Sequence, residues 1–282
     1  MAIGRVISYA GAEVAVSWTG EDAAGIAAFL FNGLPAARAD AAPVSRIDAR
    51  PGAARGSFSL RRDGTPLWDG DDLGALAEIW LGMASHDLAF HSRGGLLLHA
   101  AALATPAGGV LLPGNAGSGK TTLALWLALR GAGLRTDELV FAPDGAPEVV
   151  PCPRPLNLKR ASLPALAGLF DPAAAGEAVI EGPLGFLVAR TALSPGEPEG
   201  PLPASLAVFP RYDAGAAEAS LLPLTPGEAA VALMECNVNA RNLPGHGLKE
   251  AARLAARLRA WRLRYASFGQ LGPLLDLLGL PR

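Results

Sequence analysis

The first 90 residues contain two kinds of hydrophobic pattern. Residues 13–18 and 56–60 alternate apolar and polar side chains, which predicts half-buried strands, and residues 62–66 have the composition of a turn. From Asp72 to about Ala89 the apolar positions recur with helical spacing instead. This stripe, which predicts a helix packed on a core, consists of Leu73, Leu76, Ile79, Trp80 and Met83. We therefore expect a small α+β unit at the start of the chain.

Longer apolar runs follow from residue 95. Residues 95–103 and 109–113 have the character of buried strands, and the Thr-Pro-Ala-Gly turn at 105–108 joins them into a predicted hairpin. Residues 121–129 predict a helix that ends at a Gly-Ala-Gly sequence, and residues 134–142 predict the next strand. This succession of strands and helix indicates an α/β arrangement.

The remainder of the chain has less regular patterning. Residues 143–200 are rich in Pro and Gly, whereas residues 206–210 predict another core strand. Thr225 and Pro226 have the chemistry of a helix start, with Thr225 as the cap. The elements predicted after this start are an amphipathic helix over 247–261, a short strand over 263–265 and a final helix over 271–278.

Length and composition are typical of a compact globular protein. The chain has 282 residues, of which 50% are hydrophobic and 18% charged, and its net charge of −2 provides no basic field for nucleic acid. We expect an N-terminal α+β portion over residues 1–90 and a second domain over residues 91–282. An arginine cluster on or just after the 247–261 helix is interpreted as a solvated helix face. It comprises Arg253, Arg257, Arg259, Arg262 and Arg264.

From the sequence we expect neither a membrane span nor a signal peptide. No apolar run reaches the length that a bilayer requires, and the first residues lack the apolar segment of a secretory signal. Cys152 and Cys236 are far apart and match neither a metal-ligand spacing nor a disulfide framework. These features favour a cytoplasmic protein without a membrane partner.

One segment carries a specific chemical signature. Eight residues between the 109–113 strand and the following helix match G-x-x-x-x-G-K-[ST], the phosphate-binding P-loop. They are Gly114, Asn115, Ala116, Gly117, Ser118, Gly119, Lys120 and Thr121, and Thr122 follows directly. Only three of the 24 Lys and Arg residues are lysines, so Lys120 is not a consequence of composition. The motif predicts binding of a nucleoside triphosphate, and the alternative is a glycine-rich turn without a ligand.

Each position of the motif has a physical role in such a loop. Glycines allow successive backbone N–H groups to face an anion, and the following helix adds the positive end of its dipole. Lys120 would reach the β- and γ-phosphates, and the hydroxyl of Thr121 would bind Mg²⁺. A nucleoside triphosphate with Mg²⁺ is therefore the expected ligand.

Three side chains outside the loop are candidates for the chemistry. Asp137 lies in the strand after the loop helix, where P-loop proteins commonly have a carboxylate, so we expect it to contact Mg²⁺ or to accept a hydroxyl proton. Glu138 would face the opposite side unless the strand ends there, and the alternative is a pair of carboxylates that only solvate a sheet edge. His99 interrupts an apolar strand and needs a hydrogen-bond partner, which by itself favours a structural core histidine.

Two further basic residues lie in a Pro-flanked stretch after these candidates. Arg154 and Lys159 carry positive charge that could bind a phosphate or an acidic substrate. The alternative for both is ordinary surface charge. Arg211, Arg241 and His246 are weaker candidates and are not assigned to the site.

Taken together, these features resemble the HPr kinase/phosphorylase family, and more closely the HPr kinase-related proteins of bacteria. That family has a His ahead of the loop strand, a P-loop and an acidic pair after the loop helix, which here fall at His99, residues 114–121 and Asp137-Glu138. The similarity is specific over residues 95–142 and looser over the C-terminal half, including residues 153–159. It implies a P-loop kinase domain that transfers the γ-phosphate of ATP to a serine hydroxyl of a protein or peptide.

The same resemblance assigns roles and leaves alternatives. It implies Asp137 as the base, His99 and Glu138 as further catalytic residues, ATP and Mg²⁺ as ligands, and a homo-oligomer. Three departures are present. Glu138 stands where the family usually has Asp, and residues 180–185 resemble a later family signature without its arginine. The first 90 residues match no known substrate-recognition domain. The competing hypotheses are an ATP-binding regulatory or assembly protein without transfer activity and a small-molecule kinase.

Overall fold

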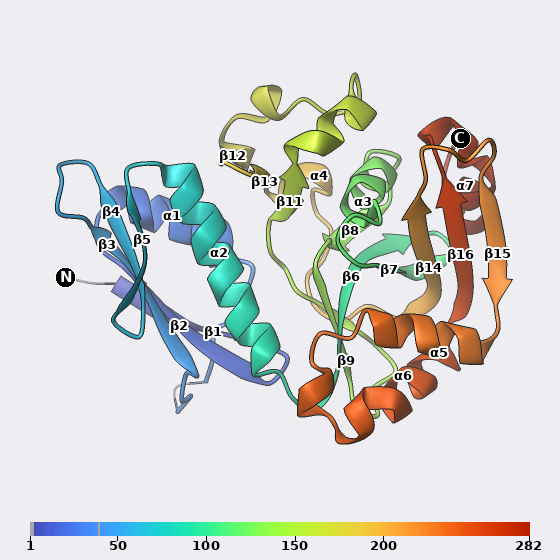
Figure 1. The fold of residues 1–282 in the computed structure, drawn as a ribbon, viewed down its shortest axis with the longest axis horizontal. Helices are drawn as coiled ribbons and strands as arrows, with labels where there is room; N and C mark the ends of the chain where they lie inside the picture. Colours follow the sequence, from blue (N-terminus) through green and yellow to red (C-terminus); the bar gives the residue numbers. More distant parts are fainter. Residues whose placement is uncertain (1–2, 39) are drawn as a thin grey trace.

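The N-terminal part of the molecule is a five-stranded sheet packed against two helices. A computed structural model describes residues 3–38 and 40–282. In its first part the strand order is β1-β2-β3-β4-β5, with β2 parallel to β3 and the other neighbours antiparallel. Helix α2 lies between this sheet and the rest of the molecule (Figure 1). The elements are β1 (Ile3–Tyr9), β2 (Ala12–Trp18), α1 (Glu21–Phe31), β3 (Ser45–Pro51), β4 (Phe58–Arg62), β5 (Thr65–Gly70) and α2 (Leu73–Phe90).

A larger sheet of eight strands forms the second part. Its order is β10-β9-β6-β7-β14-β16-β15, and β8 also pairs with β6. Strands β7, β14 and β16 are parallel, and β11-β13-β12 form a small separate sheet. The strands are β6 (Gly95–Thr105), β7 (Gly108–Pro113), β8 (Gly133–Thr136), β9 (Leu139–Pro143), β10 (Val150–Pro151), β11 (Leu156–Lys159), β12 (Val179–Glu181), β13 (Gly185–Val188), β14 (Ala204–Tyr212), β15 (Ser220–Leu224) and β16 (Arg259–Tyr265).

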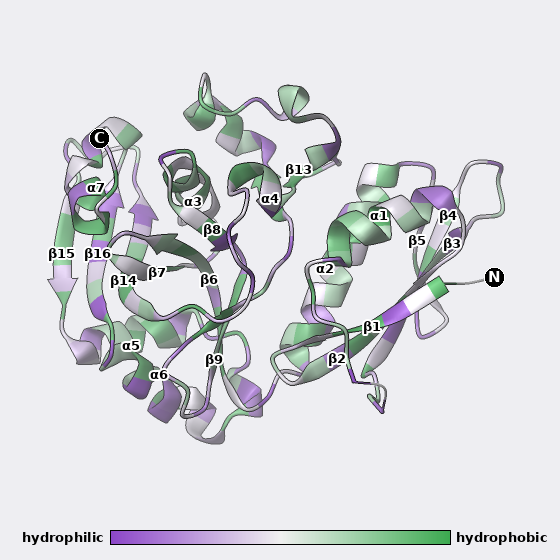
Figure 2. Ribbon diagram, turned by 180° about the vertical axis from the view of Figure 1, so that it is seen from behind, coloured by the Kyte–Doolittle hydropathy of each residue, from purple (hydrophilic) through white to green (hydrophobic). Residues whose placement is uncertain are grey.

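Helices cover both faces of the larger sheet, so the molecule is a mixed α/β protein. Helices α3 and α7 share a buried core with Leu103 and Val208, whereas α5 and α6 share a second core with Leu98 and Phe209. The central strand β6, which contributes to both cores, is apolar over most of its length (Figure 2). The helices of this part are α3 (Lys120–Ala128), α4 (Arg190–Leu193), α5 (Pro226–Glu235), α6 (Leu248–Ala255) and α7 (Gly272–Leu278).

Local sequence signals are confirmed at two helix starts. The carboxylate of Asp72 caps α2 by accepting the N–H groups of Gly74 and Ala75 at 2.8 and 3.1 Å. At the start of α5, the Thr225 hydroxyl accepts the Glu228 N–H at 3.3 Å, and the Glu228 carboxylate accepts the Thr225 N–H at 2.8 Å. The predicted hairpin is also confirmed, because β6 and β7 pair antiparallel.

The single strand predicted over residues 134–142 is wrong, because the chain bends in its middle. Strand β8 ends at Thr136 and β9 begins at Leu139, with Asp137 and Glu138 in the bend. In a continuous strand, successive side chains point to opposite faces, and one of the two carboxylates would enter an apolar core. The bend takes both carboxylates out of the strand pattern.

The amphipathic helix predicted over residues 247–261 is too long. Helix α6 ends at Ala255, and in β16 the residues from Arg262 to Tyr265 alternate exposed arginines with buried Leu263 and Tyr265. This alternation has the period of a strand, which over a few residues is easily confused with helical amphipathicity. The arginines interpreted as one helix face are therefore divided: α6 carries Arg253, whereas β16 carries Arg259, Arg262 and Arg264.

The two parts of the molecule share apolar contacts. Trp80 of α2 belongs to the same buried cluster as Leu97 and Phe141 of the larger sheet. The Tyr9 hydroxyl also donates to the carbonyl of Val150 at 2.8 Å. The division into residues 1–90 and 91–282 stays a prediction. Among the described residues, no helix combines the length and the hydropathy that crossing a bilayer would require.

Candidate functional site

The predicted P-loop lies at the carboxyl edge of the parallel strands. It joins the end of β7 at Pro113 to the start of α3 at Lys120. Because β14 and β16 run parallel to β7, their last residues, Tyr212 and Tyr265, lie at the same edge. The Tyr212 N–H donates to the carbonyl of Ser118 at 3.2 Å and ties β14 to the loop. In open α/β sheets this edge is where ligands bind.

The conformation of the loop leaves the start of α3 open. Gly119 has a φ of 86°, in the left-handed region that favours glycine. A Cβ atom on Gly119 would lie 3.0 Å from the Tyr265 hydroxyl and 3.2 Å from the Tyr212 Cβ. Among the described residues, no side chain caps this end of α3. The first N–H groups of the helix are therefore left for an anion.

Lys120 is the centre of a polar cluster below the loop. Its side chain is buried, and its Nζ lies 2.8 Å from the Nε2 of His99. The same histidine nitrogen lies 3.4 Å from the Oε1 of Glu138. One ring nitrogen cannot accept a hydrogen bond from the ammonium and donate a hydrogen bond to the carboxylate at the same time. A ligand that draws Lys120 toward the loop therefore frees His99 to donate to Glu138.

Asp137 is fully buried beside this cluster. Its Oδ2 accepts the N–H of Asn157 at 3.4 Å, and the Thr121 side chain lies beside its carboxylate. Its Oδ1 has no hydrogen-bond partner. A buried carboxylate oxygen without a partner is costly, so a bound cation or hydroxyl would stabilise Asp137.

Burial and neighbouring charges give the two carboxylates different pKa values. Burial raises the pKa of Asp137, against the opposing charges of Arg154 and Lys120. Burial would also raise the pKa of Glu138, but its polar contact with His99 and the charges of Arg154 and Lys120 together lower that pKa to about 2. Burial lowers the pKa of Lys120 itself. Asp137 is therefore the better proton acceptor of the pair, and Glu138 is the permanent anion.

The side chains beside the loop fit a hydrated Mg²⁺ bound together with phosphate. Within residues 3–38 and 40–282, no three His, Cys, Asp or Glu side chains are grouped so that they could cage a metal ion. Mg²⁺ typically takes one or two protein ligands and completes its shell with phosphate oxygens and water. The Thr121 hydroxyl and the unpartnered Oδ1 of Asp137 form such a small donor set.

The structure brings Lys120, Thr121, His99, Asp137 and Glu138 together, although they come from different elements. Thr122 has another role, because its hydroxyl donates to Ser162 Oγ at 2.9 Å and ties α3 to the 3₁₀ turn Arg160–Leu166. Of the two uncertain basic residues, Lys159 is exposed, as surface charge would be. Arg154 is buried, which excludes the surface alternative for that residue. Tyr212 and Tyr265 beside the loop have no local sequence signal and were not predicted.

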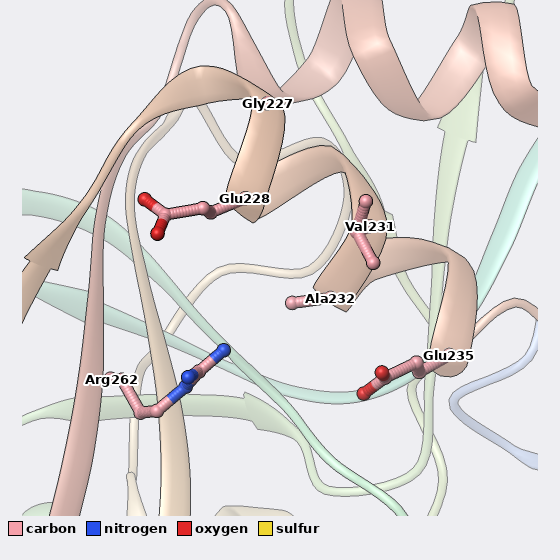
Figure 3. Close-up of a pocket in the computed structure, with 6 residues that line it drawn as sticks. All are labelled: Gly227, Glu228, Val231, Ala232, Glu235 and Arg262. Carbon is pink, nitrogen blue, oxygen red and sulfur yellow. The ribbon is translucent and has the colours of Figure 1, made fainter.

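A pocket of about 310 Å³ lies elsewhere, between α5 and β16 (Figure 3). None of the predicted site residues lines this pocket. Two of its side chains are carboxylates, and one of them, Glu228, is already part of the α5 cap. Carboxylates disfavour a phosphate group, so the pocket is not an alternative triphosphate site. Its lining residues are Gly227, Glu228, Val231, Ala232, Glu235 and Arg262.

Comparison with known proteins gives no family for this chain. No protein-family model matches the sequence, and no curated protein matches it significantly. The loop and the side chains around Lys120 are therefore the features that indicate a function. These side chains come from β6, α3 and the bend between β8 and β9, so their meeting is a property of the fold and not of one linear motif.

Proposed function

We propose that the protein is an ATP-dependent kinase of the HPr kinase type, which transfers the γ-phosphate to a serine hydroxyl of a protein or peptide. The observation that carries the proposal is the meeting of Lys120, Asp137 and Glu138 at the uncapped start of α3. A P-loop alone favours nucleotide binding. An adjacent carboxylate with a raised pKa adds a group able to take the proton of an acceptor hydroxyl.

Asp137 is the residue suited to the proton transfer. The acceptor oxygen would form a bond to the γ-phosphorus, the bond from that phosphorus to the bridging oxygen would break to release ADP, and the hydroxyl proton would pass to Asp137. Because burial raises the pKa of Asp137, it holds that proton better than an exposed carboxylate does. Thr121 and Asp137 are the residues that would hold Mg²⁺, which neutralises phosphate charge when bound.

Lys120, His99 and Glu138 would act together on the phosphate side. Lys120 would exchange its contact with His99 for the β- and γ-phosphates. The Nε2–H of His99 would then donate a hydrogen bond to Glu138, and this bond would keep the imidazole oriented beside the loop. The low pKa of Glu138, about 2, keeps that carboxylate ionised throughout.

An ATP-binding regulatory protein is the second candidate, and the burial of Asp137 favours it. The Asp137 carboxylate is 0% exposed, and its Oδ2 already accepts the N–H of Asn157. An acceptor hydroxyl can reach its unpartnered Oδ1 only if the side chains that bury it move. In a regulatory protein no acceptor enters, and the bound nucleotide changes the affinity for a partner instead.

Incubation of the full chain with Mg²⁺ and γ-labelled ATP, alone and with lysate of its host, tests the proposal. We expect label on a lysate protein or peptide, with a transfer rate about 10²–10⁴-fold lower for Asp137→Asn because the proton acceptor is lost. ATP binding, measured by calorimetry, should persist in this variant. Asp71→Asn, an exposed carboxylate next to α2, is the matched control and should transfer label normally.

The outcomes separate the candidates. Tight ATP binding with no label on any acceptor would overturn the kinase proposal in favour of the regulatory protein. Label confined to small molecules of the lysate would instead identify a small-molecule kinase. Lys120→Ala should weaken binding in either case, so it serves only to show that the nucleotide occupies the loop.

A further inference from the structure

A short segment, residues 152–157, crosses the bend that carries the two carboxylates. At one end the Cys152 N–H donates to the carbonyl of Leu139 at 2.9 Å. At the other end the Asn157 N–H donates to Oδ2 of Asp137 at 3.4 Å. These two bonds fix the segment on either side of the carboxylate pair. Arg154 lies between them in the chain, and its charge acts on both carboxylates.

The guanidinium of Arg154 is buried without a carboxylate partner. Its exposed fraction is 6%, its Nη1 donates to Ser85 Oγ at 3.1 Å and its Nε to the carbonyl of Pro155 at 3.4 Å. Within the described part of the chain, no carboxylate oxygen lies within 4.0 Å of it. Hydrogen bonds to a hydroxyl and a carbonyl leave its charge without direct compensation.

Other buried arginines of the chain differ in this respect. Arg190 is 8% exposed and its Nη2 lies 3.0 Å from Oε1 of Glu199. Arg135 is equally buried and its Nε lies 2.7 Å from Oε1 of Glu197. Burying a guanidinium is costly unless an anion accompanies it, and these two have one. Arg154 instead lacks a paired anion although it is next to a predicted phosphate site.

We propose that Arg154 contacts the γ-phosphate of bound ATP, from the side of the acidic pair, opposite Lys120. This inference rests on the proposed nucleotide-binding function of the loop. A guanidinium offers a planar fork of N–H donors that matches two phosphate oxygens, and a dry site strengthens each bond. The charge of Arg154 acts on both Asp137 and Glu138, so the guanidinium lies near the acidic pair.

The same arrangement gives the N-terminal part a role in the site. Ser85 belongs to α2, and its hydroxyl is the partner that orients Arg154 from outside the larger sheet. Ser85 is thus a positioning residue, whereas Arg154 touches the substrate. Removal of the Ser85 hydroxyl should leave the charge in place and loosen only its orientation.

The test compares ATP and ADP affinities of the full chain in Mg²⁺ buffer by calorimetry. Arg154→Gln should weaken ATP binding about 10-fold or more and leave ADP binding within about 2-fold, because ADP has no γ-phosphate. The ATP affinity of Arg154→Lys should lie between those of the unmodified protein and Arg154→Gln. Ser85→Ala should lower the ratio of ATP to ADP affinity by about 2- to 5-fold. Arg190→Gln is the matched control: it removes a buried arginine that bonds to Glu197 and Glu199.

The affinity ratio separates a phosphate contact from a structural role. A variant that merely folds less well loses ATP and ADP binding equally, as we expect for Arg190→Gln. If Arg154→Gln also weakens both nucleotides equally, or weakens neither, the γ-phosphate contact is refuted while the loop still binds nucleotide. If the unmodified protein binds neither ATP nor ADP, the proposed function fails, and the role of Arg154 fails with it.

Discussion

Helices α3 and α5 begin in opposite ways. The start of α5 is closed by its own side chains, because the Thr225 hydroxyl and the Glu228 carboxylate each accept a backbone N–H of the other residue. The start of α3 follows Gly119 in a left-handed conformation, and among the described residues no side chain caps it. The orphan N–H groups of a helix thus find their partners within the chain in one case and are left free in the other.

This difference explains why the two helix ends suit different tasks. The closed end of α5 carries a carboxylate and borders the pocket of Figure 3, where an anion would meet Glu228 and Glu235. The open end of α3 combines free N–H groups with the ammonium of Lys120 below it. An anion there satisfies the helix and the lysine together. A polar helix end left open in this way costs stability until its ligand arrives.

Substitution of the two glycines near these helix starts should give the largest contrast. Gly119→Ala introduces a side chain at a φ of 86° and close to Tyr212 and Tyr265, so we expect a loss of about 2 kcal/mol in unfolding free energy and at least 10-fold weaker ATP binding. Gly227→Ala meets no atom within 4 Å and adds a helix former to the first turn of α5. It should change stability by at most about 1 kcal/mol, in the stabilising direction.

Urea unfolding and calorimetric ATP titration of both variants measure this contrast. Equal effects of the two substitutions on ATP binding would contradict the difference between the open and the closed helix start. A normal ATP affinity of Gly119→Ala would show that the left-handed turn is not required by the loop.

Acidification should affect the two helix starts unequally through Glu138 and Glu228. The pKa of Glu138 falls from its usual 4.5 to about 2 in the folded state, so its contribution to stability is fully present above pH 4.5 and is lost as the pH falls toward 2. Asp137 opposes part of this loss, because its raised pKa makes the folded state bind its proton earlier. We expect Glu138→Gln to remove about 1–2 kcal/mol of the stability difference between pH 5 and pH 3.

Glu228→Gln is the control for this pH dependence. Hydrogen bonds from the Thr225 backbone and hydroxyl lower the pKa of Glu228, but the group is exposed. Glu228→Gln should therefore reduce the fall in unfolding free energy between pH 5 and pH 3 less than Glu138→Gln does. Stability curves from urea unfolding at pH 3, 4 and 5 provide the measurement. If the unfolding free energy of Glu138→Gln falls with acidification as much as that of the unmodified protein, His99 and Lys120 do not hold the Glu138 carboxylate ionised.

Both helix starts could be predicted because each depends on a few adjacent residues. The P-loop motif requires glycine, lysine and threonine at fixed positions. The α5 cap requires Thr225 three residues before Glu228. The bend at Asp137 and Glu138 could not be predicted in the same way. It depends on the contact with Lys120 and His99, which come from other elements, while the local pattern of residues 134–142 favours one strand.

Arg154 illustrates the same limit for the site. A Pro-flanked arginine is ordinary on a surface, and nothing in residues 153–159 indicates that Ser85 of α2 would cover it. The end of α6 shows the same limit of local prediction for the fold. The helical pattern of α6 changes to the strand pattern of β16, which contains Trp261, within three residues, 256–258. Pairing with β14 and β15 decides the strand, and pairing partners are not visible in a local window.

The smallest effect should come from removal of the α5 cap. Thr225→Ala leaves the Glu228 N–H without its acceptor, so we expect a loss of about 1 kcal/mol in unfolding free energy. Thr225→Ser keeps the hydroxyl and should lose little. Because the α5 start is closed by the chain itself, ATP affinity and the rise in melting temperature on adding ATP should be the same in both variants. A fall in ATP affinity in Thr225→Ala alone would mean that the closed helix end and the open one are energetically coupled through the sheet between them.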